Sequence, residues 1–241
     1  MDKMIHTALN TLNNIHMNRS VKSQNLSNIN VPGFRRDLGT SFSAGFLEQT
    51  EQFPSRVFAL HEGANIFSAK PGNIKSTGQE TDLAIKGSGF FITKPASGQP
   101  SLSRRGDLGV SGDGFLVNGA GAQMLDLNQA PITVPPFRKL VVSETGEMFI
   151  EPLGSEEGTR VALGSLATTS GSETPMKKDI DGEIRLVGGG VPAPDQNSII
   201  AQSFLEESNV NAVEELVDTL SQQRQFEINV KFITLSKEMD E

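Results

Sequence analysis

The sequence predicts an α+β protein with a helix at each end of the chain and an all-β middle. Three observations predict this class. Apolar residues recur at helical spacing over residues 1–30 and again after Asn211. The chain holds 24 Gly and 12 Pro, and its middle reads as short strands separated by turns. The two ends carry charges of opposite sign, which favours their pairing with each other.

Residues 1–30 predict an amphipathic helix with a narrow apolar stripe. The stripe consists of Ile5, Ala8, Leu12 and Ile15 and resumes weakly at Leu26 and Ile29. Arg19 and Lys22 occupy positions where a helix on an ordinary core would carry apolar residues. We therefore expect a packing partner with acidic groups. The helix should end before Val31, because Pro32 disfavours helical backbone in the preceding residue and Gly33 can adopt positive φ.

Residues 35–70 show no sustained periodicity, and we interpret them as an extended connector between the helix and the β-rich middle. Their phenylalanines are scattered among polar residues, at Phe42, Phe46, Phe53, Phe58 and Phe67. Such a segment can gain order when a partner surface covers its aromatic rings. A run of short strands is the alternative, and the sequence leaves both interpretations open.

Residues 71–197 are predicted to form an all-β middle domain. Glycine-rich turns separate candidate strands at 82–85, 90–93, 107–110, 115–117, 131–134, 139–143, 148–151, 160–167 and 183–187. The pair Asp113-Gly114 is a good hairpin signal. Three consecutive glycines at 188–190, followed by Pro192 and Pro194, mark a boundary.

Residues 198–241 are predicted to form a C-terminal helical segment. Residues 208–211 can cap a helix, and Glu214 and Glu215 suit its positive N-terminal end. One face then carries Val213, Leu216, Val217 and Leu220. Beyond Leu220, alternation at 226–232 would suit a strand. Helical spacing also continues there, at Ile228, Phe232, Leu235 and Met239. Because no Gly or Pro follows Pro194, we predict one long helix.

The charges of the two ends are complementary. Residues 1–36 have a net charge of +4, from Lys3, Arg19, Lys22, Arg35 and Arg36 against Asp2. Residues 201–241 have a net charge of −6, from nine acidic residues against Arg224, Lys231 and Lys237. This suits a helical pair in which charge selects the partner. Two unrelated solvent-exposed helix faces are the alternative interpretation.

The composition narrows the possible functions. The absence of Cys excludes disulfides, thiolate zinc sites and thiol nucleophiles, and the net charge of −8 disfavours nucleic-acid binding. The histidines, His6, His16 and His61, show no metal-ligand spacing, and no hydrolase elbow or phosphate loop is found. We predict no catalytic site, metal or cofactor. Paired carboxylates for glycoside hydrolysis stay open, because the fold sets their separation.

The hydropathy pattern predicts no membrane insertion and no cleaved signal peptide. No stretch approaches the ~18 consecutive apolar residues of a membrane-spanning helix. Polar residues, including Asp2 and Asn10, interrupt the N-terminus, so no signal-peptide core is recognised. If the chain leaves the cytoplasm, we expect another export route.

Residues 25–34 resemble a family signature. They read Asn-Leu-Ser-Asn-Ile-Asn-Val-Pro-Gly-Phe, which is similar to the Asn-Leu-Ala-Asn-x-x-Thr-x-Gly-Phe segment that closes the first helix of bacterial flagellar axial proteins. The likeness extends to residues 80–91, 103–108, 113–117 and 208–217 and so covers nearly the whole chain. Ser27, Val31 and Pro32 depart from the usual residues. The signature-loop positions that carry over are Asn25, Asn28, Pro32, Gly33 and Phe34.

The resemblance implies a structural subunit of the flagellar rod without catalytic activity. It implies a place in the basal body, in the rod that spans the periplasm, and export by the flagellar type III apparatus without a cleaved signal. The implied partners are copies of the chain and other proximal and distal rod subunits. The short chain and its opening residues look most like a proximal rod subunit. A distal rod or hook-type protein is the near alternative, and a secreted β-domain enzyme or glycan binder is the alternative from another class.

The resemblance also implies that the terminal segments, 1–34 and 198–241, fold together on assembly as an inner coiled layer around which the β-rich middle forms an outer layer. The expected helix contacts of this layer are Ile5, Ala8, Leu12, Ile15, Leu26, Val213, Leu216, Val217 and Leu220.

Overall fold

A computed structural model describes residues 2–39, 41–46, 57–62, 66–171, 175–179 and 181–240. The chain divides into two compact units. The first, called here the helical unit, comprises residues 1–29, 36–68 and 210–241. The second, the β unit, comprises residues 30–35 and 69–209. The α+β class predicted from the sequence is confirmed.

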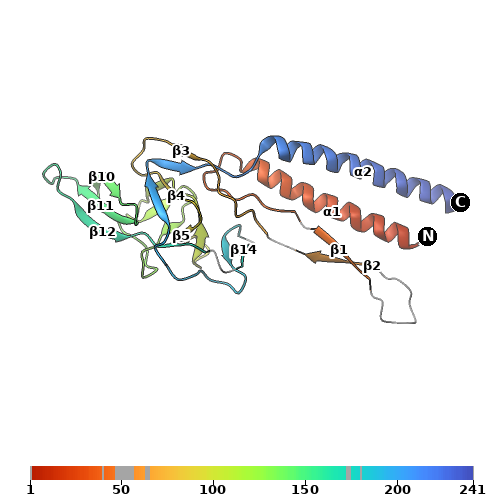
Figure 1. Cartoon of the computed structure of the whole chain (residues 1–241), viewed down its shortest axis with the longest axis horizontal. Coiled ribbons are helices and arrows are strands. Elements are labelled where there is room, and N and C mark those ends of the chain that lie inside the picture. The colour runs from red at the N-terminus through yellow and green to blue at the C-terminus, as the bar shows by residue number, and fades with distance from the viewer. Residues whose placement is uncertain are drawn as a thin grey trace. The chain divides into compact units, whose positions relative to one another are not determined.

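The helical unit contains two long helices, α1 (Asp2–Ser27) and α2 (Ala212–Asp240). They lie side by side and antiparallel (Figure 1). The Asn211 side chain accepts hydrogen bonds from the backbone N–H groups of Val213 (3.0 Å) and Glu214 (3.3 Å), so it caps α2 as expected at a helix N-terminus. The single long C-terminal helix is confirmed, and α1 ends before Val31 as predicted.

Residues 35–70, predicted as an extended connector, contain a β-hairpin. Its strands are β1 (Ser41–Phe46) and β2 (Val57–Glu62), with Ser41 opposite Glu62. Asp37 and Phe67 form a further antiparallel bridge, and Phe67 is buried. The described part of this segment therefore matches the alternative of short strands. Phe53 lies outside the described residues, as do the side chains of Phe42, Phe46 and Phe58.

The β unit consists of short antiparallel strands. They are β3 (Ile74–Ser76), β4 (Leu83–Lys86), β5 (Phe90–Lys94), β6 (Ser101–Ser103), β7 (Leu108–Val110), β8 (Leu116–Asn118), β9 (Gln123–Met124), β10 (Phe137–Val142), β11 (Glu147–Pro152), β12 (Val161–Ser165), β13 (Thr168–Thr169), β14 (Met176–Lys178), β15 (Ile184–Leu186), β16 (Ile199–Gln202) and β17 (Phe204–Glu206). The largest sheet has the order β14-β15-β6-β5-β9-β8-β7, with β13 paired to β5. Smaller sheets are β10-β11-β12, β16-β4 and β17-β3.

The hydrophobic core lies in the β unit. Its buried residues are Leu83, Ile85, Phe91, Leu108, Leu116, Met124, Ile132, Val134, Leu140, Val142, Met148, Ile150, Leu166 and Ile200. The predicted hairpin at Asp113-Gly114 is confirmed, because β7 pairs with β8 across this turn and Gly114 has φ +81°.

The segment after Ser198 differs from the sequence expectation. Residues 199–206 form two strands of the β unit, and the helix begins only at Ala212. Ile200 and Ala201 are buried, and β16 pairs with β4 so that Ile200 lies opposite Ile85. The glycines at 188–190 lie within the β unit, which continues to residue 209. The local pattern did not reveal these strands, because their pairing partners lie far away in the sequence.

Among the helices that the structure describes, none has the length and apolar character needed to cross a membrane.

Candidate functional site

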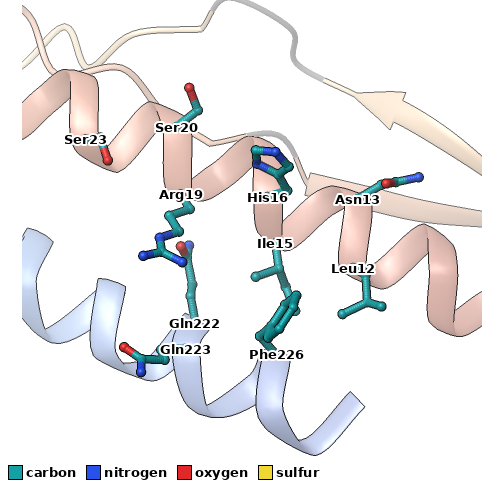
Figure 2. A pocket seen from close by; sticks show the side chains of 10 residues that line it. All are labelled: Leu12, Asn13, Ile15, His16, Arg19, Ser20, Ser23, Gln222, Gln223 and Phe226. Carbon is teal, nitrogen blue, oxygen red and sulfur yellow. The ribbon is translucent and has the colours of Figure 1, made fainter. Parts of the chain in front are cut away.

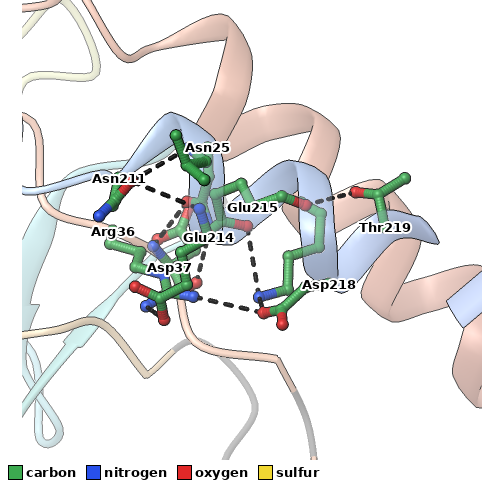
Figure 3. A network of polar contacts seen from close by, with 10 residues as sticks. Asn25, Arg36, Asp37, Asn211, Glu214, Glu215, Asp218 and Thr219 are labelled. Carbon is green, nitrogen blue, oxygen red and sulfur yellow. Dashed lines mark hydrogen bonds and ion pairs between the residues drawn. The ribbon is translucent and has the colours of Figure 1, made fainter. Parts of the chain in front are cut away.

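Opposite charges join the two helices, as the sequence analysis expected for Lys22. Lys22 Nζ lies 2.6 Å from Asp218 Oδ2 and 3.3 Å from Glu215 Oε2. Arg36 Nη1 lies 2.7 Å from Glu214 Oε1, and its Nε contacts the buried Glu215 carboxylate (Figure 3). Burial of Arg36 acts to lower its pKa, but Glu214 and Glu215 outweigh that effect and raise it. Lys22 on α1 and Arg36 in the chain that follows α1 therefore form an ionic cluster with carboxylates of α2.

Asn25, a signature-loop residue near the end of α1, forms hydrogen bonds with the chain that follows this helix. It is fully buried. Its Nδ2 donates to the Asp37 carbonyl (2.9 Å), and its Oδ1 accepts from the Asp37 N–H (2.8 Å). The same Nδ2 donates to Glu215 Oε1 (3.4 Å). One amide thus satisfies both backbone groups of Asp37 and reaches α2, which links three segments of the helical unit.

A cleft of about 610 Å³ lies along the helix pair. Its lining residues are Leu12, Asn13, Ile15, His16, Arg19, Ser20, Ser23, Gln222, Gln223 and Phe226. Ile15 from α1 and Phe226 from α2 face each other, and Arg19 points towards α2 near Gln222 (Figure 2). Phe226 is 47% exposed, so the pair leaves apolar surface in contact with water.

A second apolar surface lies on α2. At about 100° of rotation per residue, Val213, Val217, Leu220, Ile228 and Leu235 fall on the side of the helix opposite the buried Glu215. We call these five residues the α2 stripe. Their exposed fractions range from 58% to 69%. Neighbouring Leu216 is 50% exposed. The stripe is therefore uncovered in the single chain even though α2 packs on α1.

Five of the nine predicted contact residues belong to these two surfaces. Leu12 and Ile15 line the cleft, whereas Val213, Val217 and Leu220 belong to the α2 stripe. Leu26 is 38% exposed near the end of α1. The side chains of Ile5 and Ala8 lie outside the described residues.

The rest of the signature segment is divided between the two units, with Asn28 in the helical unit. The Asn28 side chain donates to the Gln24 carbonyl (2.8 Å) at the end of α1. Pro32, Gly33 and Phe34 belong to the β unit. Lys178 Nζ lies 4.2 Å from the centroid of the Phe34 ring.

No sequence pattern indicated Glu206 and Arg104, which form a buried ion pair in the β unit. Both residue types are usually exposed, and the spacing of the two residues indicates nothing about their contact. Glu215 was noted only as a first-turn carboxylate, although it contacts both Lys22 and Arg36.

The fold and these surfaces define a class of α+β protein in which paired terminal helices present uncovered apolar surface and a β-rich body lies between them in the sequence. Residues 84–150 match the family model described as the flagellar hook protein FlgE/F/G D1 domain, and residues 201–241 match the model described as flagellar basal body rod FlgEFG protein C-terminal. The chain belongs to the family of flagellar basal-body rod proteins.

Individual relatives agree with this assignment over almost their whole length. The chain is 30% identical over 243 residues to the flagellar basal-body rod protein FlgG of Agrobacterium fabrum, with 92% of this chain and 90% of the relative covered. It is 27% identical over 246 residues to the flagellar basal-body rod protein FlgF of Salmonella typhimurium, with coverage of 97% and 94%. The resemblance found in the sequence is therefore confirmed at the level of the family.

Proposed function

We propose that this chain is a structural subunit of the flagellar basal-body rod, which assembles through its terminal helices and transmits torque. The α2 stripe is the observation that carries the proposal. It is a row of apolar side chains that stays exposed although the helix already has a partner in α1. Exposed apolar rows of this kind mark interaction surfaces, because covering them releases water from apolar area.

The proposed interface uses both apolar surfaces of the helix pair. Val213, Val217 and Leu220 recur at spacings of four and three residues, the repeat that lets one helix pack along another. Leu12 and Ile15 line a cleft that can take side chains from a neighbouring helix. In this arrangement the helices form an inner coiled layer, with Ile5, Ala8, Leu26 and Leu216 among the contacts.

For the type of subunit, we favour the proximal rod protein FlgF, because the segment Met1-Asp2-x-Met4-Ile5-x-Thr7-Ala8 resembles that of proximal rod subunits. Relatives named FlgF and FlgG both match the chain over more than nine-tenths of its length, which supports a distal rod protein as the second candidate. The proposed partners are copies of the chain and other rod subunits. We propose export by the type III apparatus without a cleaved signal, and a location in the rod across the periplasm. A structural role for the family supports the absence of enzymatic activity.

A pair of matched substitutions tests the assembly interface. Leu216→Asp places a charge beside the α2 stripe, whereas Leu153→Asp makes the same change at a leucine of the β unit that is 62% exposed. Both variants should fold, because neither leucine is in the core. In a strain lacking the native gene, we expect Leu216→Asp to abolish swimming and incorporation into purified basal bodies, while Leu153→Asp supports both. Swimming cells whose basal bodies contain the Leu216→Asp chain would contradict the proposal.

A further inference from the structure

Three segments of the β unit lie where the chain passes to or from the helical unit. They are residues 30–35, 69–73 and 206–209. Backbone hydrogen bonds join them: the Asn209 N–H donates to the Phe34 carbonyl (3.2 Å), and the Glu207 N–H donates to the Asn73 carbonyl (2.7 Å). The three segments are thus adjacent within the β unit.

The carboxylate of Glu206 contacts the other two segments and the body of the β unit. The Glu206 residue is 1% exposed. Its Oε1 lies 2.8 Å from Arg35 Nη1 and accepts the Gly72 N–H at 2.7 Å. Its Oε2 lies 2.7 Å from Arg104 Nε. Its backbone carbonyl accepts the Gly33 N–H (2.7 Å). We call Glu206, Arg35, Arg104 and the Gly72 N–H the Glu206 cluster.

Both guanidinium groups of the cluster also donate hydrogen bonds to backbone carbonyls outside it. Arg35 also donates to the Lys70 carbonyl, and Arg104 donates to the carbonyls of Gly89 (3.0 Å) and Gly87 (2.6 Å). Arg104 thereby connects the cluster to the residues that precede the core strand β5.

The charge balance makes the carboxylate essential to this arrangement. Arg35 and Arg104 are 3% and 2% exposed. Burial lowers the pKa of Arg104 to about 10, with the nearby Arg35 adding to the effect and Glu206 opposing it. Burial likewise lowers the pKa of Arg35. Removing the single anion would leave two buried cations facing each other, which is strongly destabilising.

We propose that Glu206 locks the three segments together, so that they open as one unit and do so without opening of the core. The lock acts within one chain and goes beyond the proposed function, because it requires neither a rod nor a partner subunit. In a subunit that bears load, it would stop tension on either terminal segment from separating β17 from β3.

Amide hydrogen exchange of the full chain, followed by NMR, tests the lock. Glu206→Gln keeps the shape and removes the charge, and Glu207→Gln makes the same change at the adjacent, exposed residue. For Glu206→Gln we expect exchange of the Gly33, Gly72 and Asn209 amides to rise together by at least tenfold. The Ile92 amide of β5 should keep its rate, and Glu207→Gln should change none of these amides. Equal rates in the two variants, or a parallel rise at Ile92, would overturn the proposal.

A second variant keeps the test decisive if Glu206→Gln does not fold. Arg35→Met removes one cation and leaves the carboxylate paired with Arg104. We expect the same concerted rise at Gly33, Gly72 and Asn209, smaller in size. Where the double variant Glu206→Gln/Arg35→Met folds, the increase in its amide exchange rates should be smaller than the product of the increases in the two single variants. The segments would open independently if only the Gly33 amide exchanged faster. The same would follow if the increases in exchange rate of the two single variants multiplied in the double variant.

Discussion

At the scale of single residues, Gly33 shows how closely the signature loop packs. It has φ +67°, and a Cβ at this position would lie 2.4 Å from the backbone carbon of Arg104. Gly78 has a similar φ of +73°, but its Cβ would meet no atom within 4 Å. The two glycines therefore share the backbone conformation and differ in the space available.

We predict that Gly33→Ala destabilises the β unit far more than Gly78→Ala. The left-handed conformation alone costs about 1–2 kcal/mol for a residue with a side chain. At Gly33 the contact with rigid backbone should add about 1–3 kcal/mol, as overpacking does in cores. Denaturant unfolding of each variant, monitored by methyl NMR, measures the difference. Equal losses of stability would show that the loop can move away from Arg104.

At the scale of elements, ion pairs of Lys22 join α1 to α2. Its ammonium group contacts both Glu215 and Asp218, and Glu215 is almost fully buried. Lys22→Glu should therefore place three carboxylates together and cost about 2 kcal/mol, the range of hydrogen bonds to charged groups. Asp218→Lys in the same chain should restore part of this loss. The midpoint of the helical circular dichroism signal on heating measures both effects.

Lys231→Glu is the matched control for charge, because it makes the same change at an exposed position of α2. It should leave the midpoint nearly unchanged, as is usual for a surface substitution. If the double variant melted no later than Lys22→Glu alone, the ion pairs would not be what holds the helices together.

The elements also show what the sequence could and could not predict. Local patterns indicated both helices, the Asp113-Gly114 hairpin and an acidic partner for Lys22, because each depends on residues close in sequence or on net charge. They missed β16, which depends on β4 for its partner. They also missed Glu206, whose burial depends on Arg35 and Arg104 from distant parts of the chain.

At the scale of the whole molecule, the buried apolar side chains that the structure describes are divided unequally between the two units. Every residue of the hydrophobic core cluster lies in the β unit. Of the helical-unit side chains that the structure describes, Ile15, Phe67 and Val210 are buried, whereas the α2 stripe is exposed. Ordering the backbone costs about 1–2 kcal/mol per residue in either unit. Among the described side chains, the helical unit therefore has less apolar burial than the β unit to offset this cost.

We predict that the isolated chain unfolds in two steps, with the helical unit first. The chain has no Trp or Tyr, so the steps must be followed by other signals. The helical circular dichroism signal should be lost at lower temperature than the dispersed methyl resonances of core residues such as Leu83 and Ile150. A single transition shared by both signals would contradict this order. If neighbouring subunits cover the α2 stripe in the rod, the first step should shift to higher temperature in assembled material, because burial of the stripe then adds to the stability of the helical unit.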